Sequence, residues 1–596
     1  MSIPSPANIS GLYSSYTITV NGSPLNDTYP LVSIRTFYEI NKIPYAELVL
    51  IDGAVDTGDF KISETADLIP GSEIAISAGY ESKNELIFKG VVVKQAIKIT
   101  NENSSNLLVL CKHKAVQMTY NRKDAVFSTK KDSDIIGTII GTYGLTKTVE
   151  STTVVYENVF QKSATDWDFI LSRADCCGFV TSFDVDSIKI GKPNLSAAAV
   201  LLVTYGESMF SLDAELDSEN QAPSIDAQGW DPAQLKSTVS SSSEPTLNSQ
   251  GNIKAKSLSS VLSQKKLILN SGTPMADNQL KAWADSKLLR MRLSALRGSV
   301  SFQGNAKVSP GKLIQLAGLG DRFNGNAYVS SVEHTIEDGE WITRVGFGLD
   351  SKPISALPDF SDSPAAGQFP AIHGLQIGIV KKLAADPKSL FRIQVLIPSV
   401  ADDSALIWAR MANVYATKSA GFYFLPEVDD EVILGFLDGN SAYPVILGSL
   451  YSSKHKAAFT ADDKNNTKAI TTNSKLEINF DEEKKIIKIF TPGGNSITLD
   501  DDAKGITLKD QNNNTVKMNS SGVEINSPKN IVLKATGNIT LDATGKLALN
   551  SKQDVAVEGL NIKNTAKVGF TAKGNATAEI SASGQTVVKG AIVMIN

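Results

Sequence analysis

Short segments in which apolar and polar residues alternate fill the first part of the chain. Between residues 16 and 100 they include YTITV, AELVLID, SEIAISAGY and LIFKGVVVKQAIKIT, separated by Gly, Asn and Pro. A period of two is typical of strands with one buried face, and the interrupting residues are typical of turns. The pattern predicts antiparallel sheets or barrels.

Two segments show a helical pattern instead, SDIIGTIIGTYGL after Lys131 and SATDWDFILSRADCCGF after Lys162. The second has two suitable N-caps, Ser163 and Thr165. Its apolar residues at helical spacing are Trp167, Ile170, Leu171 and Ala174. They predict an amphipathic helix that packs one face against a core. A third helix is predicted within MADNQLKAWADSKLLRMRLSAL, before strands resume.

Polar segments of low complexity divide the chain. Its 596 residues exceed what one hydrophobic core usually organises, so several domains are expected. The sequence KSTVSSSSEPTLNSQGN, residues 236–252, predicts a flexible loop. A segment rich in Pro, Ser and Asp ends the first large unit. We therefore expect a hub of two barrel-like domains with helical insertions at 1–360, and a linker at 361–370.

Residues 371–455 contain five strand-like runs with short connections, which predict a small barrel of the oligonucleotide/oligosaccharide-binding (OB) type. Such barrels often bind ligands through exposed aromatic rings, and Trp408, Tyr415 and Phe422 are the candidates here. Packing of these rings in the core is the favoured interpretation, because no cluster of basic residues accompanies them. The barrel is then a scaffold.

Pairs of apolar residues recur every eight residues near the C-terminus. The pairs are Val523/Ile525, Ile531/Leu533, Ile539/Leu541, Leu547/Leu549 and Val555/Val557. A strict short period indicates one strand and one turn per unit, and the intervening Gly, Asn, Asp and Ser suit tight corners. The repeat predicts a prism-shaped β-helix, a needle with a narrow apolar core, over residues 497–596. Connecting strands are expected at 456–496.

Two arrangements of this needle satisfy the repeat. If one chain winds alone, three units form a coil and the tail is a stub of about 20 Å. If three chains intertwine, each unit pairs with strands of its neighbours and the needle reaches about 50 Å. The second arrangement leaves fewer strand edges exposed. The spacing alone leaves both open.

The charge and the residue inventory exclude several classes of function. A net charge of −5 offers no basic surface for nucleic acid. Three cysteines, Cys111, Cys176 and Cys177, exclude a disulfide framework and are interpreted as buried small side chains. Four isolated histidines, and no HExxH, CxxC, GxSxG or phosphate-loop motif, argue against a metal site or catalysis. We expect neither an enzyme nor a resident cofactor.

One segment carries a specific family resemblance. FLPEVDDEVILGF, from Phe424, is followed by PVILGSLY, which ends at Tyr451. These segments resemble the hallmark of VgrG-like spike proteins of contractile injection systems, which include type VI secretion spikes, extracellular injection particles and the hub-spikes of contractile phage tails. The residues that match the hallmark are Phe424, Pro426, Glu427, Glu431, Pro444 and Gly448. Asp429 stands where the family usually has Gly. The helix with Trp167 resembles the family's hub helix.

The resemblance implies a homotrimer with a mechanical function. In the family, a trimeric hub joins the inner tube and the baseplate, the barrels form a collar, and the needle transiently pierces a target membrane when a sheath contracts. It also implies assembly into a particle and delivery outside the cell, and leaves open whether that particle is a phage tail, a type VI system or a released particle. No signal peptide or membrane-spanning run is recognised, so we expect synthesis in the cytoplasm.

The last residues of the chain are almost all apolar. They are Ile592, Val593, Met594, Ile595 and Asn596. A blunt trimeric end made of them exposes an apolar patch unless something covers it. From the resemblance, we expect this tip to seat a conical PAAR-like cap protein, which would hold the zinc or iron if there is any. A self-capped last coil is the alternative.

Three rival functions fit parts of the sequence. An inserted lysozyme, as in the phage version of the family, has too little room in the about 45 residues between Tyr451 and Ile497. A polysaccharide lyase lacks residues for catalysis and sugar stacking, because no Arg, His, Tyr or Trp occurs after Gly505. A trimeric adhesin or phage tail fibre shares the prism, but it needs neither the hub nor the barrel.

Overall fold

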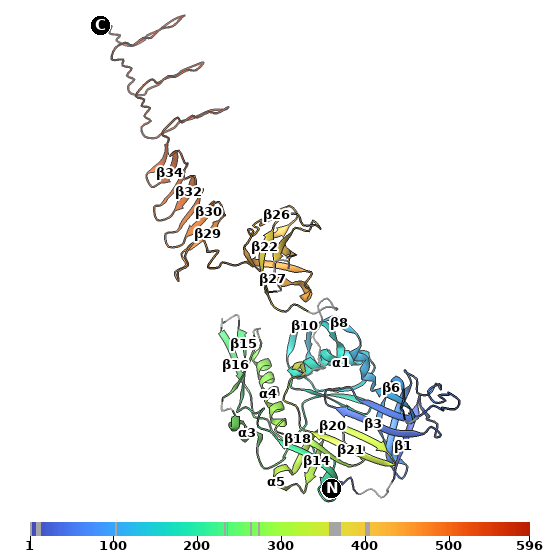
Figure 1. The fold of residues 1–596 in the computed structure, drawn as a ribbon. Coiled ribbons are helices and arrows are strands. Elements are labelled where there is room, and N and C mark those ends of the chain that lie inside the picture. The colour runs from blue at the N-terminus through green and yellow to red at the C-terminus, as the bar shows by residue number, and fades with distance from the viewer. Residues whose placement is uncertain are drawn as a thin grey trace. The chain divides into compact units, whose positions relative to one another are not determined.

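The computed structural model shows a mostly β protein, as expected. It describes residues 3–7, 13–101, 104–231, 234, 236–262, 265–271, 275–356, 371–399 and 406–595. The expected linker at 361–370 lies outside these residues. Two compact units are formed, residues 1–450 and 451–596, and each is described by itself (Figure 1).

A 13-stranded sheet is the backbone of the first unit (Figure 1). Its path runs through β14 (Met209–Leu216), β18 (Leu296–Gln303), β21 (Glu340–Phe347), β20 (Gly325–Glu337), β3 (Leu31–Glu39), β4 (Tyr45–Ile51), β7 (Ser105–Lys112), β6 (Lys83–Ile99), β5 (Glu73–Tyr80), β1 (Ser14–Val20) and β2 (Ser23–Pro24). Off this path, β13 (Leu202–Thr204) pairs with β19 (Leu313–Ala317), which pairs with β20.

The long strand β20 joins the two strand-rich regions of the hub. Its first half pairs with β19 through Tyr328 and Leu313, and its second half pairs with β3 through Ser331 and Glu39. Each region keeps its own apolar core, so the two predicted barrel-like domains share one continuous sheet.

Small sheets and helices complete the hub. The sheets are β8 (Arg122–Lys131) with β10 (Val155–Thr165); β9 (Thr146–Val149), β11 (Val180–Asp184) and β12 (Ser187–Gly191); and β15 (Ile225–Asp231), β16 (Lys236–Ser241) and β17 (Leu267–Asn270). The helices are α1 (Asp132–Thr142), α2 (Asp166–Cys176), α3 (Ala255–Leu262), α4 (Asp277–Leu293) and α5 (Gly320–Phe323), with 3-10 turns at Lys114–Thr119 and Ile354–Ala356.

The three helices predicted from the sequence are confirmed as α1, α2 and α4. Thr165 caps α2, because its side-chain oxygen accepts a hydrogen bond from the backbone N–H of Asp168 at 3.0 Å. The other candidate cap, Ser163, lies within β10. Trp167, Ile170, Leu171 and Ala174 are buried on the predicted face.

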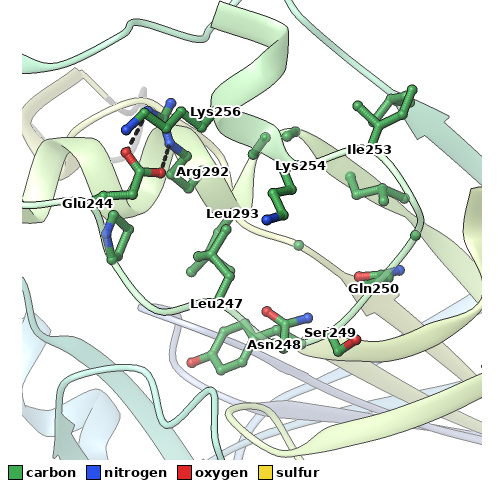
Figure 2. A pocket seen from close by; sticks show the side chains of 18 residues that line it. Glu244, Leu247, Asn248, Ser249, Gln250, Ile253, Lys254, Lys256, Arg292 and Leu293 are labelled. Carbon is green, nitrogen blue, oxygen red and sulfur yellow. Dashed lines mark hydrogen bonds and ion pairs between the residues drawn. The ribbon is translucent and has the colours of Figure 1, made fainter.

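The expectation of a flexible loop at 236–252 is wrong for residues 236–241. Residues Lys236–Ser241 form β16, which pairs antiparallel with β15. Beyond it, the carboxylate of Glu244 accepts hydrogen bonds from Nε and Nη2 of Arg292 at 2.7 and 3.1 Å (Figure 2). The Arg292 side chain is fully buried, so its charge requires this partner. A serine-rich composition does not reveal such tertiary contacts.

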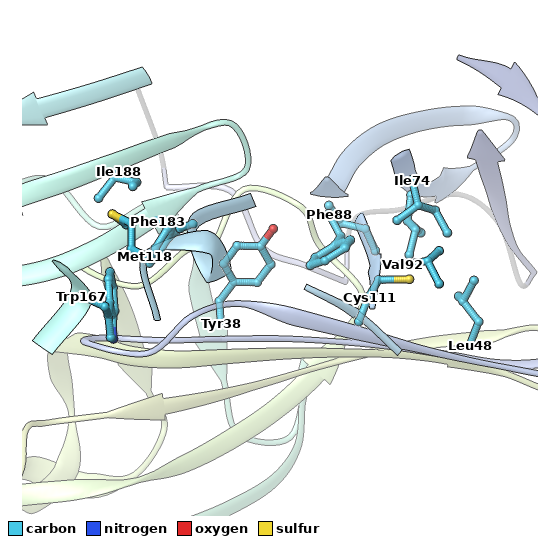
Figure 3. Packing of buried hydrophobic residues seen from close by; sticks show 14 of the residues in the cluster. Tyr38, Leu48, Ile74, Phe88, Val92, Cys111, Met118, Trp167, Phe183 and Ile188 are labelled. Carbon is cyan, nitrogen blue, oxygen red and sulfur yellow. The ribbon is translucent and has the colours of Figure 1, made fainter. Parts of the chain in front are cut away.

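Large side chains fill the main core between the sheet and the helices. Tyr38 and Phe88 meet edge to face, with ring centroids 6.2 Å apart, and Trp167 of α2 lies against Phe183 of β11 (Figure 3). Cys111 is completely buried in the same cluster. Helix α2 is therefore fixed by the same packing that covers the sheet.

Residues 376–449 form the predicted five-stranded closed barrel. Its strands are β22 (Gln376–Lys382), β23 (Arg392–Leu396), β24 (Leu406–Met411), β27 (Glu431–Phe436) and β28 (Pro444–Ser449), with a 3-10 turn at Leu437–Gly439. Between β24 and β27, the short strands β25 (Ala416–Thr417) and β26 (Ala420–Gly421) form a hairpin. The barrel core is purely apolar.

The expectation that the barrel's aromatic rings fill its core is wrong for two of the three. Tyr415 and Phe422 flank the β25–β26 hairpin and are more than half exposed. Trp408 is half-buried on β24, with the guanidinium of Arg392 6.0 Å from its ring centroid. The barrel interior is filled by smaller residues such as Val395, which leaves no room for these rings.

The second unit begins with a seven-stranded antiparallel sheet in sequence order. Its strands are β29 (Thr467–Thr471), β30 (Glu477–Asp481), β31 (Ile486–Phe490), β32 (Ser496–Asp500), β33 (Gly505–Lys509), β34 (Thr515–Asn519) and β35 (Gly522–Asn526). The predicted boundary between connecting strands and needle at 496/497 is wrong, because it falls inside β32. Continuous pairing carries the sheet across it.

The remaining residues, 527–595, contain no assigned strand. Their backbone bends at 528, 536, 544 and 552, which repeats the eight-residue spacing of the apolar pairs. The period read from the sequence is therefore also a period of the backbone, although no pairing within the chain accompanies it.

Candidate functional site

One face of the β29–β35 sheet is apolar, apart from Lys468 at its β29 end. Cross-strand register aligns two rows on it. The first row is Ile470, Ile478, Ile489, Ile497, Leu508, Val516 and Ile525. The second row is Phe480, Ile487, Leu499, Ile506, Met518 and Val523. We call these two rows the apolar ladder.

The opposite face of the same sheet is mostly polar. The row between the two apolar rows contains Ala469, Asn479, Lys488, Thr498, Thr507, Lys517 and Glu524. Successive residues of a strand point to opposite faces, so this alternation gives the sheet one polar face and one apolar face. The apolar face needs a second layer that covers it.

The apolar ladder is not covered by its own chain. Most of its side chains are exposed to solvent. Ile470, for example, is 47% exposed and Met518 is 37% exposed. A hollow of about 610 Å³ lies on it, lined by Ile489, Ile497, Leu508, Val516 and Ile531 among others. An apolar surface of this extent marks an interaction site.

The predicted needle-core residues are also uncovered. Their exposed fractions lie between 55% and 70%, and the residues are Val523, Ile525, Ile531, Leu533, Ile539, Leu541, Leu547, Leu549, Val555 and Val557. The expectation that they form a core is not met within one chain, because residues 527–595 supply no second layer. A single-chain coil would pair units three apart, and no such pairing occurs in 527–595. The described residues therefore do not show the single-chain coil.

The predicted tip residues are exposed at the end of this segment. Ile592, Met594 and Ile595 are more than 80% exposed, and Val593 is 51% exposed. Asn596 lies outside the described residues. Nothing in the described chain covers these side chains, which is what a docking surface or an interface between copies requires.

The hallmark residues of the barrel shape a turn and two strand ends. The backbone N–H of Asp429 donates to the carbonyl of Val380 at 2.8 Å, and its carboxylate lies 2.9 Å from Nζ of Lys381. Asp429 has φ 70°, the left-handed region that suits the glycine found there in the family. The ion pair with Lys381 offsets part of that strain.

The other hallmark residues build the same frame. Pro426 is buried before the turn, and the backbone N–H of Glu427 donates to a carboxylate oxygen of Asp430 at 2.9 Å. Glu431 and Pro444 begin β27 and β28, and Gly448 pairs with Ile433. Phe424 is 57% exposed. These residues therefore stand at the turn before β27 and along β27 and β28.

Three titratable side chains of the hub are buried in its packed interior, and burial shifts their pKa values. Burial lowers the pKa of His334 to about 3 and that of His113 to about 4, and it raises the pKa of Cys111 to about 12. Cys176 is exposed, contrary to the expectation of a buried thiol. In the part of the chain that the structure describes, no three His, Cys, Asp or Glu side chains gather as metal ligands.

The helices of the first unit are short. Among the described residues, none combines the length and the apolar character needed to cross a bilayer.

Sequence reasoning missed the apolar ladder of β29–β34. Its signal is present as alternation in EINFD, IIKIF, SITLD and GITLK. These strands recur at nine or ten residues, since they begin at 477, 486, 496 and 505. A search for a strict eight-residue repeat therefore starts too late in the chain.

A hub sheet, a closed OB barrel and an uncovered C-terminal ladder define a modular β protein built to associate with other copies. The chain belongs to the family of the Alg8 N-terminal domain, which matches residues 10–338. Residues 376–451 match the type VI secretion system/phage-baseplate injector OB domain. Residues 486–596 match the phage baseplate V C-terminal trimerisation domain. The resemblance to VgrG-like spike proteins is confirmed.

The chain is similar to one curated protein over a short segment and to several solved structures. The type VI secretion system spike protein VgrG5 of Pseudomonas aeruginosa is 36% identical over 59 residues, which cover 10% of this chain and 8% of that protein. Among solved structures, the 43 kDa tail protein of prophage MuSo2 from Shewanella oneidensis is similar, with TM-score 0.44 and 10% identity, over 57% of this chain and 99% of that one.

Two further solved structures are similar over more of the chain. An E. coli type VI secretion component covers 73% of this chain and 99% of its own, with TM-score 0.38 and 10% identity. A chain of the Francisella PdpA–VgrG complex covers 87% of this chain and 81% of its own, with TM-score 0.37 and 9% identity.

Proposed function

We propose that the chain is the trimeric central spike of a contractile injection system, which caps the inner tube and punctures a target membrane when the sheath contracts. The observation that carries the proposal is the uncovered apolar ladder within a segment that matches a trimerisation domain. Three copies that turn their ladders toward a common axis cover one another and leave their polar faces outside.

The burial gained in such a trimer is large. Full burial of one Ile, Leu, Met or Phe side chain is worth about 1.5–3 kcal/mol. Ile489, Ile497 and Leu508 are 42%, 41% and 39% exposed in the single chain. Covering what remains contributes about 1 kcal/mol per side chain. Summed over the ladder, this gives a tightly packed shaft that resists bending, as a puncturing element requires.

The exposed end of the chain suits a cap. Ile592, Met594 and Ile595 from three copies form one apolar platform, and a PAAR-like cap protein with an apolar base is the partner we propose. Zinc or iron, where present, belongs to that partner, and this chain holds no cofactor and performs no catalysis. A self-capped last coil is the alternative.

The tip proposal has a direct test. Deleting residues 591–596 from the full chain removes the platform and leaves the ladder intact. We expect the trimer to persist and binding of a PAAR-like protein, measured by co-sedimentation, to disappear. Unchanged cap binding would reject the docking role and favour the self-capped end.

The match of residues 376–451 to an injector OB domain supports assembly of the spike into a larger particle. The proposed partners are the inner tube and the baseplate, with the target membrane as a transient contact and nucleic acid as none. The chain is proposed to be made in the cytoplasm and to leave the cell with the particle. A trimeric adhesin or tail fibre would share the ladder, but the matches at 10–338 and 376–451 favour the spike.

Mass and shape test the proposal. The full chain should have three times the chain mass of 63.7 kDa in light scattering after size-exclusion chromatography. Negative-stain images should show a threefold club with a thin needle. A monomeric mass at micromolar concentration would rule out the proposed spike, and a needle without a club would favour the fibre.

A further inference from the structure

The outer surface of the OB barrel carries an apolar area that its own chain does not cover. The outward residues of β22, β27 and β28 and of the residue before β22 are Leu375, Ile377, Ile379, Ile433, Val445 and Leu447. Leu375 is 61% exposed and Leu447 is 51% exposed. Outward positions of a solvated sheet are normally polar. We call this area the outer barrel face.

Two glycines, Gly435 and Gly448, interrupt the outer barrel face, and Gly448 lies beside the β-bulge between β27 and β28. Neither Gly435 nor Gly448 is among the residues with positive φ. A Cβ at Gly448 would meet nothing within 4 Å, and one at Gly435 would lie 3.4 Å from Leu447 Cδ1. By contrast, a Cβ at the inward Gly378 would lie 2.9 Å from Leu434 Cδ1, so packing explains that glycine.

Glycine weakens the interior of a strand, and it often marks a place where another group approaches the backbone closely. At Gly448 the approaching group must come from outside the described chain, because a Cβ there would meet nothing within 4 Å. A Cβ at Gly435 would already be in van der Waals contact with Leu447. The two glycines therefore form a floor, rimmed by apolar side chains, that accepts a protruding side chain.

A loop of the same barrel presents such a side chain. Phe391 is 94% exposed, and its neighbour Leu390 is 55% exposed. Ala385, Ser389 and Phe391 have φ values of 64°, 52° and 56°, a region that costs energy for residues other than glycine. Three strained positions in one short loop indicate a conformation that the surrounding contacts enforce.

Asp386 enforces this conformation. Its carboxylate accepts hydrogen bonds from the backbone N–H groups of Lys388 at 3.0 Å and Leu390 at 2.7 Å, and from Nε of Arg392 at 3.1 Å. The side chain of Asp386 is almost fully covered. Phe391 is thus held in place without touching a core, which is the property of a preorganised anchor.

We propose that Phe391 of one copy packs onto the Gly435–Gly448 floor of the neighbouring barrel, three times around the trimer. The proposal rests on the trimer of the proposed function. A threefold ring is a heterologous assembly, so each barrel must offer two different complementary surfaces. The anchor loop and the outer barrel face are such a pair, and the following trimerisation segment at 486–596 brings the copies together.

A second copy fits this surface better than an oligosaccharide does. Sugar binding needs hydrogen-bonding groups beside the ring that stacks on it, and the guanidinium next to Phe391, that of Arg392, is already bonded to Asp386. The centre of the outer barrel face offers aliphatic side chains and glycine, which suit a phenyl ring, and Glu431, in register with Ile379, lies at its edge.

Photo-crosslinking of the full chain tests the contact. Phe391→p-benzoylphenylalanine should crosslink to a second copy within residues 375–379, 431–436 or 444–449, as mapped by mass spectrometry. The matched control places the probe at Val414, which is also 94% exposed but lies beside the β25–β26 hairpin. It should give no crosslink to those segments.

Gly448→Val supplies an independent test. The open space at its Cβ lets the isolated barrel accept the substitution, while the new side chain fills the floor. We expect the crosslink from position 391 to fall at least fivefold, with the mass still trimeric through the ladder. An undiminished crosslink would overturn the proposal.

Other outcomes separate this contact from the proposed function. A trimer that crosslinks from position 391 only to the hub, to the hairpin or to its own chain overturns the contact and leaves the spike standing. Protection of position 391 by a soluble oligosaccharide also overturns it. A monomeric mass removes the spike itself.

Discussion

Replacing Ile497 by Ala tests whether the apolar ladder is covered by other copies. The side chain lies in the middle of the ladder, paired with Ile489 and Leu508, and is 41% exposed in one chain. Full burial of isoleucine is worth about 1.5–3 kcal/mol, so covering the exposed part contributes about 0.6–1.2 kcal/mol per chain. Three chains lose about 1.8–3.6 kcal/mol together, which lowers the trimer association constant about 20- to 400-fold.

The assay is the urea midpoint of dissociation, followed by mass at several protein concentrations. Ile497→Ala should lower the midpoint, and the loss should grow as the protein is diluted, because assembly follows mass action. Thr498→Ala is the matched control, since it removes a side chain of the same strand from the polar face. Equal shifts for the two variants, or a midpoint independent of concentration, would refute the covered ladder.

Substitutions at three further positions test the first unit. Glu244→Gln leaves the fully buried guanidinium of Arg292 without its countercharge, so the thermal midpoint should fall by an amount that corresponds to about 3 kcal/mol, whereas an exposed pair would lose under 1. His334 has its pKa lowered from 6.5 to about 3 by burial, so the unfolded chain binds the proton first, and stability should fall as pH drops below 6.5, by up to about 1.4 kcal/mol per pH unit. In His334→Gln, the free energy of unfolding from urea titrations should depend less steeply on pH between 4 and 7 than in the unchanged chain. Asp429→Gly relieves a positive φ but loses an exposed ion pair, so the free energy of unfolding should stay unchanged or rise by up to about 1 kcal/mol. Asp429→Val should lower the free energy of unfolding, because valine tolerates a positive φ poorly.

Local patterns in the sequence predicted most individual elements. Helices α1, α2 and α4 and the five barrel strands follow from apolar spacing and turn residues, because those signals are local. The segment at 236–252 was misjudged because its order comes from Arg292, which lies far away in sequence. The exposure of Tyr415 and Phe422 was not predicted for a related reason. Whether a ring is buried depends on contacts with distant segments, and no described residue covers these two rings.

The two halves of the second unit differ in how they turn, and this difference explains why the ladder is only partly built by one chain. In the β29–β35 sheet, residues with positive φ stand at the turns, and these are Lys475, Lys485, Gly494, Lys504, Asn513 and Gly522. Tight hairpins need such residues to reverse the chain. Within the described residues 523–595, no residue has positive φ, although Gly537 and Gly545 are available at the corners.

The corners after β35 therefore bend the chain without reversing it. A strand that is not reversed cannot pair with the strand before it, so its backbone hydrogen bonds must be satisfied from elsewhere. The eight-residue period at 523–557 sets the spacing of the apolar side chains. The residues with positive φ before it set the hairpin turns. The same chain thus pairs with itself up to Asn526 and offers unpaired strands beyond, as an element that completes its folding only in a trimer does.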